Sequence, residues 1–519
     1  MSGGTEGTAI TEALVANVLN ARFENIEEEV VENTKRRILD MIGNAIAGAK
    51  CDGNPELAEV AAGWGGKKEA TILGYGDKGA VADVAFVNCI FGRSFDRGPL
   101  TYVINGKRSP NHITETSALT AIALGESKGI SGKELMAAMV AGDDLAARLH
   151  LALDRAQPGQ SLPSGTPPPP PTRGSEEAFA AAAIAGRILG LNNDQLRNAF
   201  GLATMLSGRG GGGVLEGGPP SGGRPSGPSG AGGPPESRPG WQGVRDRSFI
   251  AAMERAGRED SEKNVSTKLS NGISARNGIN AVQLGKAGWP GVKDPFFGQN
   301  GGHFPGLNSV HHPERITGDL GKKFIVEVCF KPYPGGRPTG APTAAALAIA
   351  SKHNINIDDV EEIILHLSPV ATAAHYATPY VIGDYPPMNA LWSYYFAVAS
   401  ALYRKSAAAE NFTGAKVRDP RLQALIKKVK LGYLDKPEGV ELEVIMKDGR
   451  RFSEYVRTAL GDPSDPLPRE GLIDKFMEQI EFSRLVEKKD AEKIIELVDG
   501  LEKVEDIQSI TRLAKKRGR

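Results

Sequence analysis

The chain has 519 residues, of which 40% are hydrophobic and 24% are charged. A single compact domain rarely grows this long, and the composition is that of a globular protein with a substantial core, so we expect two domains. The 62 basic and 62 acidic residues cancel, and no basic run is long enough to follow a phosphate backbone, which argues against a nucleic-acid-binding function.

Cysteine usage and targeting signals predict a cytoplasmic protein. The three cysteines, Cys51, Cys89 and Cys329, are scattered and odd in number, which suits a reducing compartment and provides neither a disulfide framework nor a zinc-binding spacing. The N-terminus lacks the basic and apolar regions of a signal peptide, and no apolar run approaches the roughly 20 residues that a membrane span needs. We therefore expect no membrane association. The pair His311-His312 has no third ligand at a useful spacing, so we expect no metal or other cofactor.

Helices are predicted for most of the sequence up to about residue 205. Ser131 precedes Glu134 by three residues, which is the spacing of a helix-capping pair, and Asn192 begins another helix in the same way. The helix predicted for 179–189 is rich in alanine, which lets neighbouring helices approach closely in a packed bundle. This half of the chain is therefore predicted to be all-helical.

Two stretches interrupt the helical pattern. Residues 157–174 contain five consecutive prolines, Pro167 to Pro171, which predict an extended polyproline segment. Residues 207–240 consist almost entirely of Gly, Pro, Ser and Arg, and this composition predicts a disordered surface insertion.

The hydrophobic period changes from about residue 322. Alternating apolar residues predict strands at 324–330, 363–367, 440–446 and 452–456. Asp448-Gly449 predicts a hairpin turn between the last two. Helical segments are expected between the strands near 343–352, 389–403 and 421–430, and again after about residue 466.

These elements predict a mainly α fold with a large all-helical domain and an inserted, smaller α+β domain. We assign residues 1–322 to the helical domain, 323–464 to the α+β domain and 465–519 to helices that complete the helical domain.

Five sequence motifs follow one another over 300 residues, at 37–43, 129–148, 180–191, 268–278 and 330–339. Together and in this order they resemble the MmgE/PrpD family, which includes 2-methylcitrate dehydratase, cis-aconitate decarboxylase and iminodisuccinate epimerase. The resemblance implies a helical domain with a lid domain, a homodimer, and an active site without a metal in the cleft between the domains. It also implies a small polycarboxylate substrate.

The chemistry of this family removes a proton next to a carboxylate, which requires a base near the carbon and cations that hold the developing negative charge. The resemblance makes His112 the general acid or base and Asp96 either its partner or the base itself. It makes Lys268 and Lys331 the two active-site lysines, which stabilise charge or bind substrate carboxylates. We expect Arg337 to clamp a substrate carboxylate, because a guanidinium binds carboxylates with two parallel hydrogen bonds.

Each of these assignments has a structural alternative. Lys268 and Lys331 could be solvated surface lysines, and Arg337, beside Gly and Pro, could merely decorate a turn. His112 could be a surface or capping histidine, since it stands in a loop that leads into a helix. Asp96 could form a salt bridge with Arg93 or Arg97, and Ser94 could occupy the key position in its place.

Further candidates are weaker. Arg276 is expected to pack within its helix, and His366 to be exposed on the outer face of its strand. His375 and Tyr376 are candidates for the lining of the cleft.

The sequence also departs from the family pattern. The loop before the alanine-rich helix keeps Gly165-Thr166 but contains no histidine, and Gly340 stands where some members place a histidine. The main hypothesis is a cofactor-independent carbon–oxygen lyase or isomerase that resembles 2-methylcitrate dehydratase. The alternatives are an epimerase of an iminodisuccinate-like substrate, a catalytically silent member that binds or assembles with partners, and an unrelated helical interaction protein.

Overall fold

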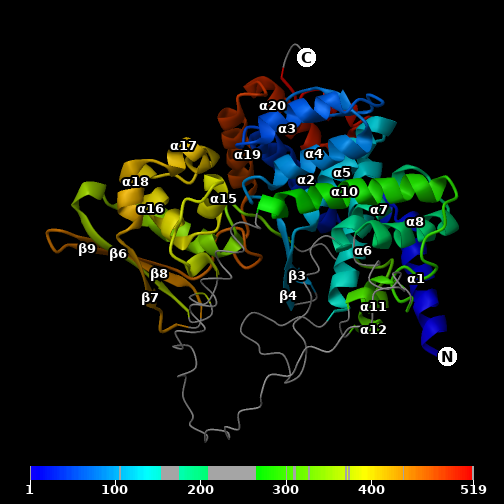
Figure 1. Cartoon of the computed structure of the whole chain (residues 1–519), viewed down its shortest axis with the longest axis horizontal. Coiled ribbons are helices and arrows are strands. Elements are labelled where there is room, and N and C mark those ends of the chain that lie inside the picture. The colour runs from blue at the N-terminus through cyan, green and yellow to red at the C-terminus, as the bar shows by residue number, and fades with distance from the viewer. Residues whose placement is uncertain are drawn as a thin grey trace, which may run out of the picture.

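The structure is a computed structural model that describes residues 2–104, 107–153, 175–207, 265–299, 301–307, 311–324, 328–368, 371, 375–436 and 438–516. The predicted polyproline segment and the Gly/Pro-rich insertion beyond Ser207 lie outside these residues. The part of the chain that is described is mainly helical, which confirms the predicted fold class at this level. Figure 1 shows a large group of helices on the right and a smaller sheet with its own helices on the left.

One hydrophobic core is built by helices from the first 320 residues and from the C-terminus. These helices are α1 (Ser2–Asn20), α2 (Glu28–Gly48), α3 (Asn54–Gly63), α4 (Val81–Arg93), α5 (Ile113–Lys128), α6 (Gly132–Leu151), α7 (Ser175–Ile188), α8 (Asn193–Leu206), α10 (Val265–Lys286), α11 (His303–Leu307), α12 (Glu314–Thr317), α19 (Arg469–Ser483), α20 (Lys488–Asp499) and α21 (Gln508–Thr511).

The first part of the chain is not all-helical, so that prediction was too strict. Two short sheets interrupt the helices: β1 (Ala70–Thr71) pairs with β2 (Lys78–Gly79), and β3 (Leu100–Ile104) lies between β4 (Lys107–Asn111) and β5 (Val328–Cys329). Strands of two to five residues carry too few alternating side chains to be recognised from hydrophobic periodicity. Residues 325–327, at the start of the strand predicted for 324–330, lie outside the description.

The alanine-rich helix α7 packs against α5, α6 and α10, as its composition predicts. Its alanines from Ala180 to Ala183 are fully buried. A Cβ atom added to Gly142 of α6 would lie 2.8 Å from the carbonyl oxygen of Ala180, and one added to Gly278 of α10 would lie 2.7 Å from that of Ala178. Small residues on both partners therefore allow the helix axes to approach closely.

The two predicted helix starts are confirmed in different ways. Asn192 and Gln195 form the full reciprocal capping box at α8. At α6 the Ser131 hydroxyl accepts a hydrogen bond from the Glu134 amide at 3.3 Å, but the Glu134 carboxylate binds Arg187 instead of reaching back. A long-range ion pair has replaced the local half of this capping interaction.

A second hydrophobic core forms mainly within residues 345–446. Its sheet has the order β7-β6-β8-β9, from β6 (Val360–Leu367), β7 (Val429–Tyr433), β8 (Val440–Met446) and β9 (Arg451–Val456). Its helices are α13 (Gly340–Lys352), α15 (Pro386–Leu391), α16 (Tyr394–Arg404), α17 (Gly414–Val417) and α18 (Pro420–Ile426). The α+β content of this part is as predicted, while its role as an inserted lid domain stays a prediction.

The strands of this sheet were recognisable to different degrees. Residues of β8 alternate strictly between buried and half-buried, and Gly449 takes a left-handed conformation (φ 86°) in the predicted hairpin turn. The strand β7 was missed, because a helix was predicted up to residue 430. It pairs in parallel with β6, and only that non-local pairing makes this short segment extended.

The C-terminal helices return to the first core, since α19 packs on α2 and α20. Arg37 and Arg148, which belong to the family motifs, make buried contacts within the helical core. Arg37 forms a buried ion pair with Asp143, whereas Arg148 binds Asp144 at 2.8 Å and the carbonyl oxygens of Ile316 and Gly318 at 2.7 Å each. No helix among the described residues has both the length and the apolar character needed to cross a membrane.

The crossing of α2 and α4 gives a stability test. A Cβ atom at Gly48 would lie 1.8 Å from the carbonyl oxygen of Phe91, so the variant Gly48→Ala must push the two helices apart. We expect this overpacking to cost about 2–3 kcal/mol and to lower the melting temperature by several degrees in calorimetry. In the control Gly63→Ala, where the added methyl meets nothing within 4 Å, stability should stay the same or rise. Equal melting temperatures for Gly48→Ala and the wild type would contradict this packing.

Candidate functional site

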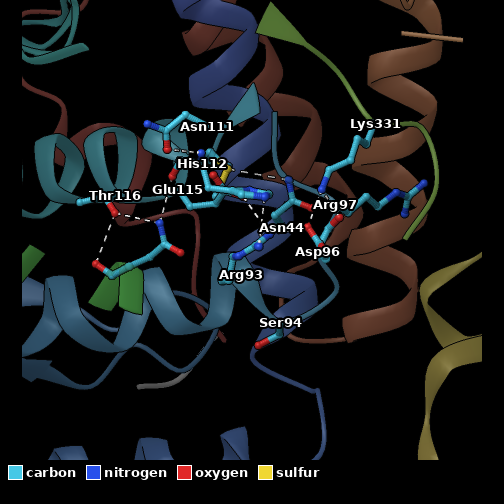
Figure 2. A network of polar contacts seen from close by, with 12 residues as sticks. Asn44, Arg93, Ser94, Asp96, Arg97, Asn111, His112, Glu115, Thr116 and Lys331 are labelled. Atoms are coloured by element: carbon cyan, nitrogen blue, oxygen red, sulfur yellow. Dashed lines mark hydrogen bonds and ion pairs between the residues drawn. The ribbon is translucent and has the colours of Figure 1, made fainter. Parts of the chain in front are cut away.

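Three of the five predicted site residues, Asp96, His112 and Lys331, lie together where α4 ends, α5 begins and the chain leaves β5 (Figure 2). Helix α4 ends at Arg93, and Asp96 follows in the left-handed region with φ 46°. A non-glycine residue rarely takes this conformation, and such strain is found preferentially at functional sites. In this conformation, three residues after the end of the helix, the Asp96 carboxylate reaches back to Arg93.

Asp96 is a buried anion with partners from three parts of the chain. Its Oδ1 forms ion pairs with Arg93 and, at 2.5 Å, with Nζ of Lys331. Its Oδ2 accepts a hydrogen bond from the Trp392 indole at 2.7 Å. The predicted alternative of a salt bridge from Asp96 to Arg93 is therefore confirmed. Arg97 instead binds Glu478 and the carbonyl oxygen of Pro332.

His112 occupies the N-cap position of α5, and its backbone is held on both sides. Its amide donates to Oδ1 of Asn111 at 2.7 Å, and its carbonyl accepts from Nδ2 of Asn271 on α10 at 3.0 Å. The His112 side chain is 27% exposed, whereas the charged side chains of Arg93, Asp96, Glu115 and Lys331 around it are buried. It makes no side-chain cap, so the predicted alternative of a capping histidine does not hold.

The contacts of the His112 ring define its tautomer. The Nε2 atom lies 3.1 Å from NH2 of Arg93, and Nδ1 lies 2.9 Å from Oε1 of Glu115. A guanidinium only donates hydrogen bonds and an ionised carboxylate only accepts them. Nε2 must therefore accept from Arg93, while Nδ1 carries the proton and donates it to Glu115, so the imidazole is neutral.

Charges and burial set the protonation states of this group. Burial alone raises the pKa of Asp96, but Arg93 and Lys331 outweigh burial and hold that pKa well below its usual range. Burial and Arg93 lower the pKa of His112, although Glu115 opposes them. Burial raises the pKa of Glu115, but His112 and Arg93 bring it below its usual value. Two carboxylates thus balance two cations around a neutral imidazole.

Lys331 follows the strand β5 and is 4% exposed. Its ammonium group donates to the backbone carbonyl of Asp96 as well as to the carboxylate. The preceding residue, Phe330, is held by a hydrogen bond of 3.0 Å from its amide to the carbonyl of Gly461. The structure therefore places Lys331 beside Asp96, while the roles predicted for both residues stay predictions.

Lys268 lies in a different set of contacts. Its Nζ is 3.5 Å from Sγ of Cys51 and 3.1 Å from the Tyr385 hydroxyl, and it lies over the Tyr385 ring. The side chain is buried, yet no carboxylate pairs with it among the described residues. It is connected to His112 through α10, because Asn271 lies one turn further along that helix.

Arg337 does not join this group in the structure. It begins a short 3₁₀ helix, Arg337–Thr339, and forms an ion pair with the buried Asp462. Its expected role as a substrate clamp therefore requires it to share or leave that partner, and the role stays a prediction.

The weaker candidates are placed as follows. Arg276 does not pack within its own helix as expected, since it binds Asp83 of α4 at 2.8 Å and covers the Phe86 ring. His366 is half-buried on its strand, with Nδ1 3.3 Å from the carbonyl of Tyr433. The side chain of His375 lies outside the described residues, and Tyr376 contacts the ring of Tyr394. In the part of the chain that is described, no three metal-ligating side chains come together.

Three members of the site were missed as functional residues. Arg93 was considered only as a salt-bridge partner, and Glu115 and Trp392 were not considered. A signal for Glu115 existed, because a carboxylate three residues after a histidine at a helix start lies on the same face of the first turn. No local signal indicated Trp392, which is 296 residues from Asp96.

The fold and the site describe a mainly helical protein in which a neutral imidazole lies within a cluster of buried charges. The profile of the MmgE/PrpD N-terminal domain matches residues 12–210, and that of the C-terminal domain matches residues 333–503. The chain therefore belongs to the MmgE/PrpD family, as the sequence motifs predicted.

Two curated relatives are similar to the chain. Cis-aconitate decarboxylase of Homo sapiens is 22% identical over 532 residues, which cover 98% of this chain and 95% of the relative. Cis-aconitate decarboxylase of Mus musculus is 27% identical over 287 residues, which cover 52% of this chain and 56% of the relative. The match to the mouse protein thus spans little more than half of its length.

The burial of Asp96 gives a prediction for stability. In Asp96→Asn, Arg93 and Lys331 keep their charges without the anion, which should cost about 3–5 kcal/mol at pH 7. Because the folded-state pKa lies below the unfolded value of about 3.9, the wild type should lose this contribution as the pH falls below about 4. Denaturant unfolding from pH 7 to pH 3 should therefore show a flatter pH dependence for Asp96→Asn. The control is Asp474→Asn on the exposed face of α19, which should follow the wild-type curve.

Proposed function

We propose that the protein is an enzyme that transfers a proton next to a carboxylate of a small di- or tricarboxylate, as a cofactor-independent lyase or isomerase. The observation that carries this proposal is the neutral His112 imidazole, held by Glu115 and Arg93 beside Lys331. Because its pKa is lowered, the imidazole is neutral at neutral pH and carries no proton on Nε2. This is the right form for a general base. The names of the two relatives support a substrate with several carboxylates.

We assign separate roles to the two carboxylates. Both oxygens of Asp96 are occupied by donors, so Asp96 acts as the anchor of Arg93 and Lys331 and not as the base. Glu115 fixes the proton on Nδ1 of His112, which leaves Nε2 as the atom that exchanges a proton with the substrate. This is the arrangement by which a carboxylate usually orients a catalytic imidazole.

The cations stabilise the negative charge that develops when the proton leaves. Lys331 and Arg93 lie close to Asp96 in a group without net charge. They can therefore attract a negative charge at short range, although the group as a whole does not. Among the described residues Lys268 contacts the uncharged side chains of Cys51 and Tyr385, and its ammonium group is therefore the cation best suited to bind a substrate carboxylate.

The reaction can proceed in two ways after proton removal. Loss of a leaving group from the adjacent carbon gives a dehydratase-like lyase, and return of the proton from the other face gives an epimerase. The silent-member alternative is favoured by one observation, which is that the charges of the site are already balanced without a substrate.

The variant His112→Asn tests the proposal. The purified protein is incubated in deuterated water with 2-methylcitrate, citrate, cis-aconitate or iminodisuccinate and followed by proton NMR. The wild type should consume at least one of them or exchange its α-proton, and His112→Asn should be about 100-fold slower or worse. His366→Asn, which changes a histidine on the strand β6, should react like the wild type. If the wild type shows neither turnover nor exchange, the silent-member alternative is correct for these substrates.

Lys268→Met tests the binding of a substrate carboxylate. Loss of one charge-assisted hydrogen bond to the substrate should raise KM about 10-fold to 100-fold, while kcat changes less. Lys352→Met, at a residue 56% exposed and paired with Glu454, is the control and should leave both constants unchanged. A fall in kcat at constant KM would instead assign Lys268 to the chemical step.

A further inference from the structure

Arg93 donates a hydrogen bond to Nε2 of His112, the atom that must accept the substrate proton in the proposed reaction. Its NH2 group donates to Nε2 of His112 at 3.1 Å, and Nε2 has a single lone pair. Glu115 holds the opposite nitrogen, so the imidazole cannot present another basic atom. In this arrangement His112 is therefore neutral, but the lone pair of its Nε2 atom is occupied by the hydrogen bond from Arg93.

Among the hydrogen bonds and ion pairs of Arg93 with the described residues, the contact to His112 is the one with an uncharged partner. Its NH1 group binds the carboxylates of Asp96 and, at 3.4 Å, of Glu115, whereas its NH2 group donates to the uncharged imidazole. A hydrogen bond from a guanidinium to a carboxylate is roughly twice as strong as one to a neutral acceptor. An additional carboxylate would therefore replace His112 as the partner of NH2, while NH1 keeps Asp96.

The exposure of the group shows from which side such a carboxylate arrives. The Asp96, Glu115 and Lys331 side chains are at most 5% exposed and that of Arg93 is 6% exposed, while His112 is 27% exposed. An incoming ligand thus meets the His112 ring and the adjacent NH2 group of Arg93 before any other member of the group.

We propose that Arg93 is a substrate-binding residue whose engagement by a substrate carboxylate uncovers Nε2 of His112. Binding and base activation are then one event, because only a ligand with a carboxylate beside the reacting carbon draws the guanidinium away. The inference rests on the proposed role of His112 in proton transfer and adds the substrate feature that the site requires.

The electrostatics of the group act in the same direction. Among the described residues, the charged groups that act on His112 are Arg93 from α4, Asp96 from the following turn and Glu115 from α5. Lys331 beyond β5 pairs with Asp96, and α10 contributes the uncharged Asn271. Arg93 is among the causes that lower the pKa of His112. Pairing Arg93 with a substrate anion weakens that effect, so the uncovered imidazole is also a stronger base.

The test observes His112 directly and needs no turnover. Full-length protein labelled with ¹⁵N-histidine is titrated with tricarballylate, an unreactive tricarboxylate, and the His112 signals are assigned by their absence in His112→Asn. The free protein should show a protonated Nδ1 and an Nε2 that accepts a hydrogen bond. Saturation with tricarballylate should move the Nε2 signal to that of a free acceptor and raise the pKa of His112 by about one unit, a tenfold change in proton affinity. The uncharged trimethyl ester should have no effect, and His366 serves as the internal control.

Variants at Arg93 complete the test. Arg93→Met, which lacks a donor, should show the uncovered Nε2 signal without ligand and should lose at least tenfold in tricarballylate affinity by calorimetry. Arg93→Lys should restore part of both. Since Arg93→Met removes a cation that two buried carboxylates share, the variant could be destabilised. ¹⁵N-arginine labelling of the wild type therefore provides a second readout, in which the Arg93 guanidinium signals must shift on ligand addition.

Two results would overturn the proposal. Tricarballylate that binds without moving the Nε2 or Arg93 signals would show that the guanidinium stays on His112. Absence of binding at millimolar concentration would show that Arg93 takes no such ligand. Neither result decides whether the enzyme turns over a substrate, and turnover without a response of Nε2 would leave the proposed function intact.

Discussion

The buried Asp96 carboxylate is the interaction on which the rest of the site depends. A charge at 5% exposure is tolerated only if it is paired and hydrogen-bonded, and here the partners come from α4, from the segment after β5 and from Trp392 in the second core. These three segments converge on one side chain, so the carboxylate links residues that belong to both parts of the fold. The left-handed backbone at Asp96 is a local strain that this convergence maintains.

A second buried ion pair, between Lys475 and Asp40, stabilises the turn that carries Asp96 and Arg97. Lys475 of α19 forms an ion pair with Asp40 of α2 at 2.6 Å and donates to the carbonyl of Arg97 at 2.8 Å. Burial lowers the pKa of Lys475 to about 8 even with Asp40 beside it. The C-terminal helix α19 therefore helps to position the turn that carries Asp96. This explains why the family motif around Asp40, which has no contact with the proposed reacting atoms, still bears on the site.

The charges of the site are balanced without a ligand, and this bears on how a carboxylate could bind there. Arg93 and Lys331 are matched by Asp96 and Glu115, so a ligand with several negative charges gains little from them until one contact is exchanged. Under the proposed function, such a site would recognise a carboxylate by substitution of a partner and not by an excess of positive potential. The family match indicates the scaffold, whereas the contacts of Arg93 and Glu115 orient the His112 ring in this chain.

The sequence by itself determined the mainly α class, the alanine-rich helix α7, the strands β6, β8 and β9, and the family, because these depend on local periodicity and on motif order. It also placed His112 correctly at a helix start. Only the tertiary structure decided that Lys331 meets Asp96 across 235 residues, that Arg93 covers Nε2 of His112, and that Lys268 lies with Cys51 and Tyr385 instead. Such contacts join segments whose distance in space follows from the packing of whole helices, and no local pattern of residues records that packing.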